Sequence, residues 1–337
     1  MQPSHTSNCP AEIDLVAIGG GTGLATLLSG LKVFVNSQID NLPMVRHLSA
    51  IVAVSDDGGS SGRLRDELQM PPPGDIRNCM VALSEDSHLL SRLFQYRFSG
   101  EGDLSGHSFG NLFLAAMSEI TGDFAEAVRL SSEVLASKGH IFPATVANVR
   151  LGAELQDGRI VRGETNISKV GSRISKLCLE PENCEPHPDA LAAIARADIV
   201  TIGPGSLFTS LLPPLLVRGV AQAIADSEAK KVFVCNLMTQ PGETDGFTAG
   251  RHLEIVREYT PQLNFDYVIV NGTPINEEQV EAYRLEGAEQ IGVHGSILGA
   301  TIEGAMVVHA NLLDDGPKVR HQPEKLARAV LSCTHHV

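Results

Sequence analysis

The segment DLVAIGGGTGLATLLSGLK, residues 14–32, decides the fold class of this chain. Its first residues, Asp14–Ile18, form a short apolar run that is typical of a buried strand. The glycines from Gly19 to Gly23 then permit a tight turn, and an amphipathic run continues to Lys32. A strand, a glycine turn and a helix in this order begin a unit in which parallel strands alternate with helices.

Further short apolar runs, rich in valine and isoleucine, follow along the chain, and each precedes a cluster of glycine, asparagine or proline. They cover residues 49–55, 198–202, 231–235 and 266–270. This repeated order predicts the α/β fold class, with a doubly wound, mostly parallel sheet.

The segment from Asp75 to about Lys138 has a helical period instead, and Asp75, Ser108 and Asp123 are candidate helix caps. Residues 147–164 predict a hairpin, because two alternating runs flank Gln156-Asp157-Gly158. We therefore expect a helical and hairpin cap region, inserted at about 75–175, within a single domain over residues 12–333. Residues 1–11 are predicted to be an N-terminal tail.

Composition excludes several classes of function. The 337 residues carry a net charge of −14, which disfavours binding to nucleic acid, and aromatic residues make up only 4%. No apolar run is long enough for a membrane span, and no basic residue precedes the first strand to form a signal peptide. The six cysteines include no Cys-x-x-Cys pair, which predicts reduced thiols of a cytoplasmic protein rather than a zinc site.

The glycine turn is the first candidate for ligand binding. Gly20, Gly21, Thr22 and Gly23 can bring backbone N–H groups close to an anion, and the helix that follows adds its positive end. The turn is an incomplete G-x-G-x-x-G motif, and no Gly-Lys-Ser/Thr follows to make it a Walker A loop.

A second candidate loop, SDDGGSSGR, follows the strand at 49–55. Asp56 and Asp57 can bind ribose hydroxyls, hold Mg²⁺ or serve as acid and base. Gly58 and Ser60 offer N–H and O–H donors to a phosphate, which Arg63 and Arg65 can neutralise.

Four more blocks place polar groups at predicted helix starts or after predicted strands. They contribute Arg77 and Asn78; His107, Ser108 and Asn111; Gly203, Gly205 and Ser206; and Asn236 and Thr239. Because ligands bind beyond the carboxyl ends of parallel strands, we expect these loops to converge on one crevice. The residues alone thus predict a phosphate-bearing ligand, such as a nucleotide.

Six blocks, taken in order and spacing, resemble the gluconeogenesis factor proteins of bacteria, the YvcK-like group. They are GGGTGL, SDDGGSSGRLR, PPPGDIRN, GHSFGN, GPGSLFTS and NLMTQPGET, and they lie between residues 18 and 244. This group belongs to the wider superfamily of 2-phospho-L-lactate transferases, which is also called CofD-like. One departure is Phe109, where the family pattern has leucine. Residues after Thr244 carry no family inference.

The resemblance implies a three-layer, Rossmann-like fold and a cytoplasmic protein. It implies binding of a UDP-sugar such as UDP-N-acetylglucosamine, and a regulatory role that links carbon metabolism to cell-wall precursor synthesis and cell shape. By match of motif, the family's ligand site falls on residues 20–23, Asp56, Asp57, Asn78, His107, Asn111, residues 203–206 and Asn236.

Two other functions remain open at this point. One is a phosphotransferase of the 2-phospho-L-lactate transferase type, which would use a nucleotide-activated donor and hold Mg²⁺ on Asp56 and Asp57. The other is a nicotinamide-dependent dehydrogenase, which the incomplete glycine motif disfavours. The acidic loop also lies about 35 residues after the glycines, where such enzymes have their ribose-binding acid after about 20. For a regulator, we expect an enzyme of amino-sugar or cell-wall precursor synthesis as partner, and a homo-oligomer is compatible with the sequence.

Overall fold

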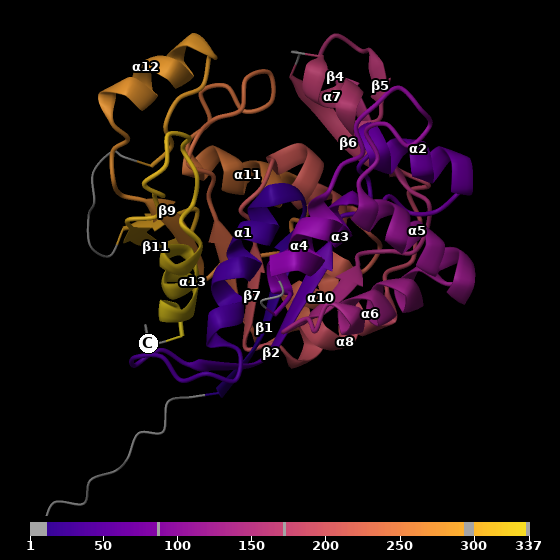
Figure 1. Cartoon of the computed structure of the whole chain (residues 1–337). Coiled ribbons are helices and arrows are strands. Elements are labelled where there is room, and N and C mark those ends of the chain that lie inside the picture. The colour runs from indigo at the N-terminus through magenta and orange to yellow at the C-terminus, as the bar shows by residue number, and fades with distance from the viewer. Residues whose placement is uncertain (1–11, 86–87, 171–172, 293–299, 335–337) are drawn as a thin grey trace, which may run out of the picture.

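One mostly parallel sheet forms the centre of the computed structural model, which describes residues 12–85, 88–170, 173–292 and 300–334 (Figure 1). Its strand order is β10-β11-β9-β8-β7-β1-β2-β3, and only β10 and β11 pair antiparallel. The strands are β1 (Glu12–Gly19), β2 (Met44–Val52), β3 (His140–Pro143), β7 (Ile199–Ile202), β8 (Lys230–Val234), β9 (Tyr267–Asn271), β10 (Thr301–Ile302) and β11 (Ala305–Ala310).

The predicted fold class is confirmed, and β1, β2, β7, β8 and β9 lie where the apolar runs place them. The sequence did not indicate β3, β10 or β11. β3 has only four residues, of which the first is exposed, the third partly buried and the other two buried. Such a short run carries too little periodicity to distinguish it from a loop.

Helices cover both faces of this sheet, which makes the three layers of the predicted Rossmann-like sandwich. On one face, α1 (Gly21–Leu31) packs against α3 (Gly74–Leu83) and α13 (Pro323–Ser332). The other face carries α8 (Pro188–Arg196), η2 (Leu207–Leu211), α9 (Leu212–Leu216) and α10 (Val220–Asp226), with α11 (Ala249–Tyr259) against α9. The short η1 (Lys32–Phe34) continues α1, and α12 (Glu277–Leu285) lies at the upper left of Figure 1.

The helices between β2 and β3 are α2 (Gly59–Leu68), α3, α4 (His88–Gln95), α5 (Phe109–Thr121) and α6 (Phe124–Val134). Ser108 and Asp123 cap α5 and α6 as predicted, each accepting a hydrogen bond from the backbone N–H three residues on. Asp75 is not a cap: it lies inside the first turn of α3, behind Pro73 and Gly74, and its carboxyl group accepts a hydrogen bond from the N–H of Gly21.

A separate antiparallel sheet has the order β5-β4-β6. It consists of β4 (Arg150–Leu155), β5 (Ile160–Arg162) and β6 (Ile174–Glu180), with α7 (Glu164–Lys169) between β5 and β6. The predicted hairpin around Asp157-Gly158 is confirmed, whereas the third strand was not foreseen. Figure 1 shows this small sheet beside α2, above the end of the central sheet where the strands finish.

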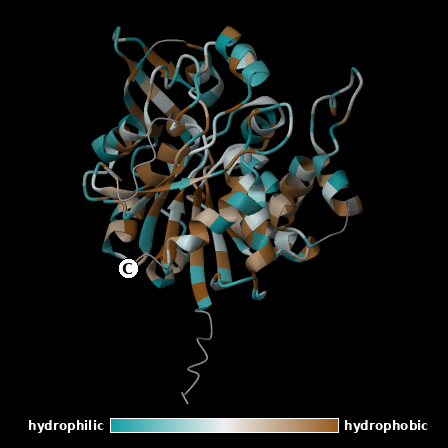
Figure 2. Cartoon of the chain, turned by 90° about the vertical axis from the view of Figure 1, so that its left-hand side faces the viewer, coloured by the Kyte–Doolittle hydropathy of each residue, from teal (hydrophilic) through white to brown (hydrophobic). Residues whose placement is uncertain are grey.

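The core follows the strands of the central sheet. Figure 2 shows hydrophobic residues along these strands and on the helix faces toward them, with hydrophilic residues outside. All four residues of β7 and all five of β9 are buried, as expected for strands covered on both faces. In the part of the chain that the structure describes, no single helix could span a membrane; one bent pair, Leu207–Leu216 with Val220–Asp226, meets the length and composition test jointly.

Candidate functional site

The topology places a switch point between β1 and β7. From β1 the chain crosses to β2 on one side, whereas from β7 it crosses to β8 on the other. Loops after such a pair of strands diverge, and ligands of open α/β sheets bind there. We call the loops after β1, β2, β7 and β8, together with the amino ends of α3 and α5, the switch-point site.

The glycine turn after β1 packs tightly against its neighbours. A Cβ on Gly23 would lie 2.3 Å from the carbonyl oxygen of Pro204, and a Cβ on Gly20 would lie 2.7 Å from Oδ2 of Asp75. Gly21 has φ +61°, which favours glycine. The side chain of Thr22 is exposed. These glycines therefore let α1 approach the β7 loop and α3, besides offering N–H groups.

The two aspartates of the second loop have different roles. Asp56 accepts a hydrogen bond from the N–H of Gly58 at 2.8 Å, which closes the loop on itself. Oδ1 of Asp57 accepts from both the N–H and the hydroxyl of Thr165, at 2.8 and 2.7 Å. Asp57 thus fastens α7 and the small sheet to the switch-point site, a role that the sequence did not reveal.

Replacing Thr165 by valine tests this fastening, because valine keeps the shape and removes one donor. We expect a loss of roughly 1.5 kcal/mol in the free energy of unfolding, the lower end of the range for one hydrogen bond to a charged group, because the N–H of residue 165 still donates to Asp57. Chemical denaturation measures it, with exposed Ser168→Ala on the same helix as the control. Equal stability of the two variants would contradict the fastening role.

The two arginines of the second loop also differ. Arg65 is 1% exposed; its Nε donates to Oδ1 of Asn148 at 2.8 Å, and its NH2 donates to the carbonyl of Val149. The expectation that Arg65 neutralises a phosphate is therefore wrong: it joins α2 to the start of β4. Arg63 is exposed, and its NH2 donates to the carbonyl of Ser105 at 2.6 Å.

A buried polar corner lies between α2 and α5. Oγ of Ser60 is 2.9 Å from Nδ1 of His107, and Nδ2 of Asn111 donates to Ser60 and Ser61 at 3.2 and 3.4 Å. Burial, followed by the charge of Arg63, lowers the pKa of His107, so this imidazole is neutral at pH 7. Oδ1 of Asn111 is buried without a partner. The hydroxyl of Ser108 is already used as the cap of α5.

Arg77 and Asn78 lie together in α3, close to this corner. NH2 of Arg77 donates to Oδ1 of Asn78 at 2.7 Å, and Nε of Arg77 is buried without a hydrogen-bond partner. Such unpartnered buried atoms are rare in folded proteins. Nε of Arg77 and Oδ1 of Asn111 are therefore candidate groups for hydrogen bonds to a ligand. Oγ of Ser55 and Oε1 of Gln240, in the loops after β2 and β8, are also buried without a partner.

The loops after β7 and β8 are joined by reciprocal hydrogen bonds. Asn236 accepts from the N–H of Gly205 at 3.1 Å and donates to its carbonyl at 2.7 Å, and Ser206 donates to Glu243 at 2.7 Å. Gly203, with φ +92°, precedes this turn. Thr239 instead exchanges two hydrogen bonds with the backbone of Glu289. Its N–H donates to the carbonyl of Glu289, and its hydroxyl accepts from the N–H of Glu289, so this hydroxyl is already engaged.

Three carboxyl groups that sequence reasoning missed as site residues join Asp56 and Asp57: Asp75, Glu164 and Glu243. Burial, and then the charge of Asp56, raises the pKa of Asp75 to about 7. Burial, and then Asp75, Asp56, Asp57 and Glu243, raises the pKa of Glu164 to about 9. No local pattern marks Glu164, because only the fold carries α7 to the second loop. Nowhere in the described ranges do three or more His, Cys, Asp or Glu side chains form a group that could hold a metal ion.

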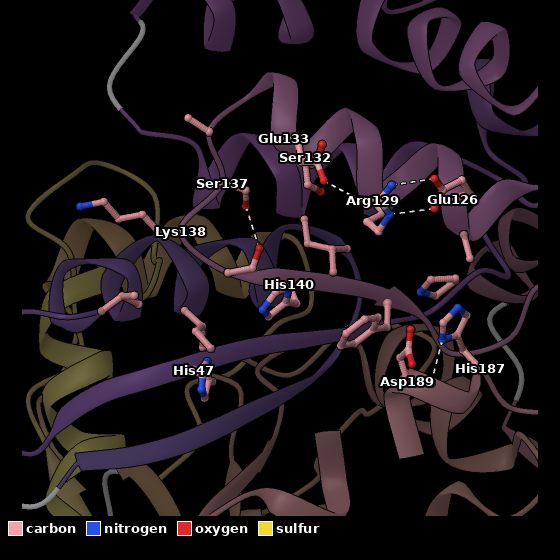
Figure 3. A pocket seen from close by; sticks show the side chains of 18 of the residues that line it. His47, Glu126, Arg129, Ser132, Glu133, Ser137, Lys138, His140, His187 and Asp189 are labelled. Carbon is pink, nitrogen blue, oxygen red and sulfur yellow. Dashed lines mark hydrogen bonds and ion pairs between the residues drawn. The ribbon is translucent and has the colours of Figure 1, made fainter. Parts of the chain in front are cut away.

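Figure 3 shows a different cavity, of about 1280 Å³, on the edge of the central sheet. It lies along β3 and α6 and includes His47, from the half of β2 nearer its amino end, so it is remote from the switch-point site. Arg129, which points into it, is ion-paired with Glu126 and Glu133. None of the predicted site residues lines it, and we do not place the ligand there.

The structure therefore brings most of the predicted site residues together at the switch point, and reassigns a few. Thr22 and Thr239 do not direct a free hydroxyl into it, and Ser108 and Asp57 are engaged as described above. Those whose backbone or side-chain groups meet there are Gly20, Gly21, Gly23, Asp56, Gly58, Ser60, Arg77, Asn78, His107, Asn111, Gly203, Gly205, Ser206 and Asn236.

The family model and the relatives that match this chain agree with one another. Residues 15–313 match the family model described as 2-phospho-L-lactate transferase CofD. The gluconeogenesis factor of Halalkalibacterium halodurans is 46% identical over 318 residues, covering 94% of this chain and 95% of that protein. The gluconeogenesis factor of Bacillus subtilis is 44% identical over 317 residues, covering 93% and 95%.

A solved structure agrees as well. The crystal structure of a UPF0052 family member from Bacillus halodurans superposes with a TM-score of 0.88 at 45% identity, covering 95% of this chain and 99% of that one. Sequence, fold and near-complete coverage thus agree, and we conclude that the chain belongs to the CofD family, in the group whose relatives are named gluconeogenesis factor.

Proposed function

We propose that the protein binds a UDP-sugar, such as UDP-N-acetylglucosamine, at the switch-point site and acts as a regulator rather than as an efficient enzyme. The observation that carries this proposal is the convergence of four strand-end loops with the amino ends of α3 and α5, where Nε of Arg77 and Oδ1 of Asn111 are buried without partners. The relatives' name, gluconeogenesis factor, supports a role in carbon metabolism.

In this proposal the regulator works in the cytoplasm and links carbon supply to cell-wall precursor synthesis and cell shape. Its partner would be an enzyme of amino-sugar or cell-wall precursor synthesis. Co-purification from cells with and without supplied amino sugar tests the partner. Recovery of no such enzyme under either condition would remove this part of the proposal.

The transferase alternative rests on the family match. It needs Asp56 and Asp57 as ligands of Mg²⁺. Oδ1 of Asp57 accepts two hydrogen bonds from Thr165 and Oδ1 of Asp56 accepts the N–H of Gly58, which leaves Oδ2 of each for a metal. In the described residues these carboxyl groups do not form, with a third His, Cys, Asp or Glu, a group that could hold a metal ion, and we therefore favour binding without turnover.

Calorimetric titration of the purified protein decides between these functions. UDP-N-acetylglucosamine, GDP, GTP and NAD are titrated separately, with and without Mg²⁺. We expect saturable binding of the uridine ligand alone, and recovery of that ligand intact. Preference for a guanine nucleotide, or consumption of ligand that depends on Mg²⁺, would support the transferase, and selective binding of NAD would support a dehydrogenase.

A further inference from the structure

Three arginines from different elements converge on the loop that precedes α5. Arg63 comes from α2, and its NH2 donates to the carbonyl of Ser105 at 2.6 Å. Arg97 follows α4, and its NH1 donates to the next carbonyl, that of Gly106, at 2.5 Å. Arg77 comes from α3 and crosses Gly110, where a Cβ would lie 2.8 Å from its Cγ and Cδ. The fold thus gathers three guanidinium groups beside one short loop.

The positive charge of these three groups is not cancelled by ion pairs. Their hydrogen-bond acceptors are backbone carbonyls and the amide oxygen of Asn78, and across the described ranges none of the three lies within 4.0 Å of a carboxylate oxygen. By contrast, arginines elsewhere in the protein, such as Arg129 and Arg251, each bind two glutamates.

Arg97 acts on Arg77, and two of the arginines act on the buried corner. Burial, and next Arg97, lowers the pKa of Arg77. Burial, and next Arg63, lowers the pKa of His107; Arg97 lowers it further, and Glu67, whose effect is weaker than that of Arg63 but stronger than that of Arg97, raises it. Mutual repulsion of this kind is a cost that a bound anion removes, and guanidinium groups bind phosphate with two parallel hydrogen bonds.

The other side of the switch-point site is lined by carboxyl groups. Asp56, Asp57, Asp75, Glu164 and Glu243 lie there, and the carboxyl group of Asp75 already accepts the N–H of Gly21 in the glycine turn. A phosphate at that turn would face these carboxyl groups, whereas a sugar or ribose hydroxyl can donate to them. Arg77, in the same helix turn as Asp75, lies between the two sides.

We infer that Arg63, Arg77 and Arg97 form the subsite for the ligand's phosphate groups, and that the carboxyl groups take its hydroxyl-bearing part. The phosphates then lie at the amino end of α5 and not on the glycine turn after β1. The identity of the nucleotide rests on the proposed function, whereas the anion subsite does not.

The test compares ligands with and without phosphate. UDP, uridine and inorganic pyrophosphate are titrated against the wild-type protein, Arg63→Gln and Arg97→Gln. Where one of these ligands binds too weakly for calorimetry, NMR at millimolar ligand concentration measures its affinity. Glutamine removes the charge and keeps a polar amide on a shorter side chain, so the stability of each variant is measured as well. Arg196→Gln, at the exposed end of α8 that leads into β7, is the matched control, since it changes net charge equally.

We expect each subsite variant to weaken UDP and pyrophosphate by about 10-fold or more, the usual effect of losing one charge-assisted hydrogen bond. Uridine binding should stay unchanged, and Arg196→Gln should match the wild-type protein. Raised ionic strength should reduce the affinity for pyrophosphate.

Three results would overturn the inference: unchanged UDP binding in both variants, equal weakening of UDP and uridine, or an equal effect of Arg196→Gln. Thermal unfolding of each variant shows whether the loop is intact, and Arg97→Lys, which keeps the charge, should retain part of the pyrophosphate affinity. The failure of the proposed function is distinguishable: the wild-type protein would then bind pyrophosphate through the arginines but no uridine compound.

Discussion

Replacing Gly23 by alanine is expected to destabilise the protein by roughly 3 kcal/mol or more, which lies at the upper end of overpacking substitutions. The new Cβ would lie 2.3 Å from the oxygen and 2.7 Å from the carbon of the Pro204 carbonyl, and 3.1 Å from Cα of Gly205. These are backbone atoms of the neighbouring loop, so no side-chain rotation can relieve the contact. Either α1 or the loop after β7 must move.

Thermal unfolding measures this effect, and a fall in Tm of about 4 °C or more is expected for a chain of this size. Gly102→Ala is the control, because no atom lies within 4 Å of the position where its Cβ would be. Ligand binding should be lost together with stability, since both loops belong to the switch-point site. If Gly23→Ala and Gly102→Ala unfold at the same temperature, the close approach of the two loops is not rigid.

The second large effect is a fall in stability between pH 7 and 8.5. The pKa of Glu164 is raised to about 9, far above its ordinary value, by burial and by four neighbouring carboxyl groups. Over this interval the folded protein keeps a proton that the unfolded chain has already lost. Stability therefore falls as pH rises, by about 1.4 kcal/mol for each pH unit and each such proton, or up to about 2 kcal/mol in total.

Glu164→Gln should remove most of this dependence, because the amide is neutral at every pH and has nearly the same shape. The pH range is chosen to limit the contribution of other groups, and Asp75, whose pKa is raised to about 7, adds a smaller fall near pH 7 that stays in the variant. Burial lowers the pKa values of His252 and His321, and these groups therefore reduce stability as the pH falls below 7. Burial raises the pKa values of Cys235 and Cys333 to about 12, which affects it above pH 8.5.

Urea unfolding at pH 7, 7.75 and 8.5 measures both proteins, and Glu119→Gln on the exposed side of α5 is the control. The wild-type protein and the control should lose stability in parallel, and Glu164→Gln should overtake them at the highest pH. A wild-type slope that persists in Glu164→Gln would assign the effect to another group.

The sequence predicts those parts of the fold and site that depend on neighbours in the chain. The glycine turn lies between a strand and a helix, as its spacing indicates, and Ser108 and Asp123 cap the helices that they precede. In each case the residue type and its neighbours in the chain are sufficient for the prediction, because the interacting groups are separated by only a few residues.

The sequence fails where the partner is distant. Asp57 lies in a loop typical of ligand binding, but its partner Thr165 is 108 residues away. Arg65 follows the same loop, and only the position of Asn148 and Val149 shows that its charge is buried. Glu164 lies after a hairpin without any motif. The carboxyl side of the site is therefore a product of tertiary structure, whereas the loops themselves are local.

The position of β1 in the middle of the sheet has a consequence for synthesis. Its neighbour β2 follows soon after it, but its other neighbour is β7, and the N–H of Asp14 binds a carboxylate 184 residues further along the chain. Ribosomes add about 5–20 residues per second. The edge of β1 that pairs with β7 therefore stays unpaired for on the order of 10–40 s during synthesis. A nascent chain therefore exposes a backbone edge that other chains can pair with, and chaperones have most to protect before residue 202 emerges.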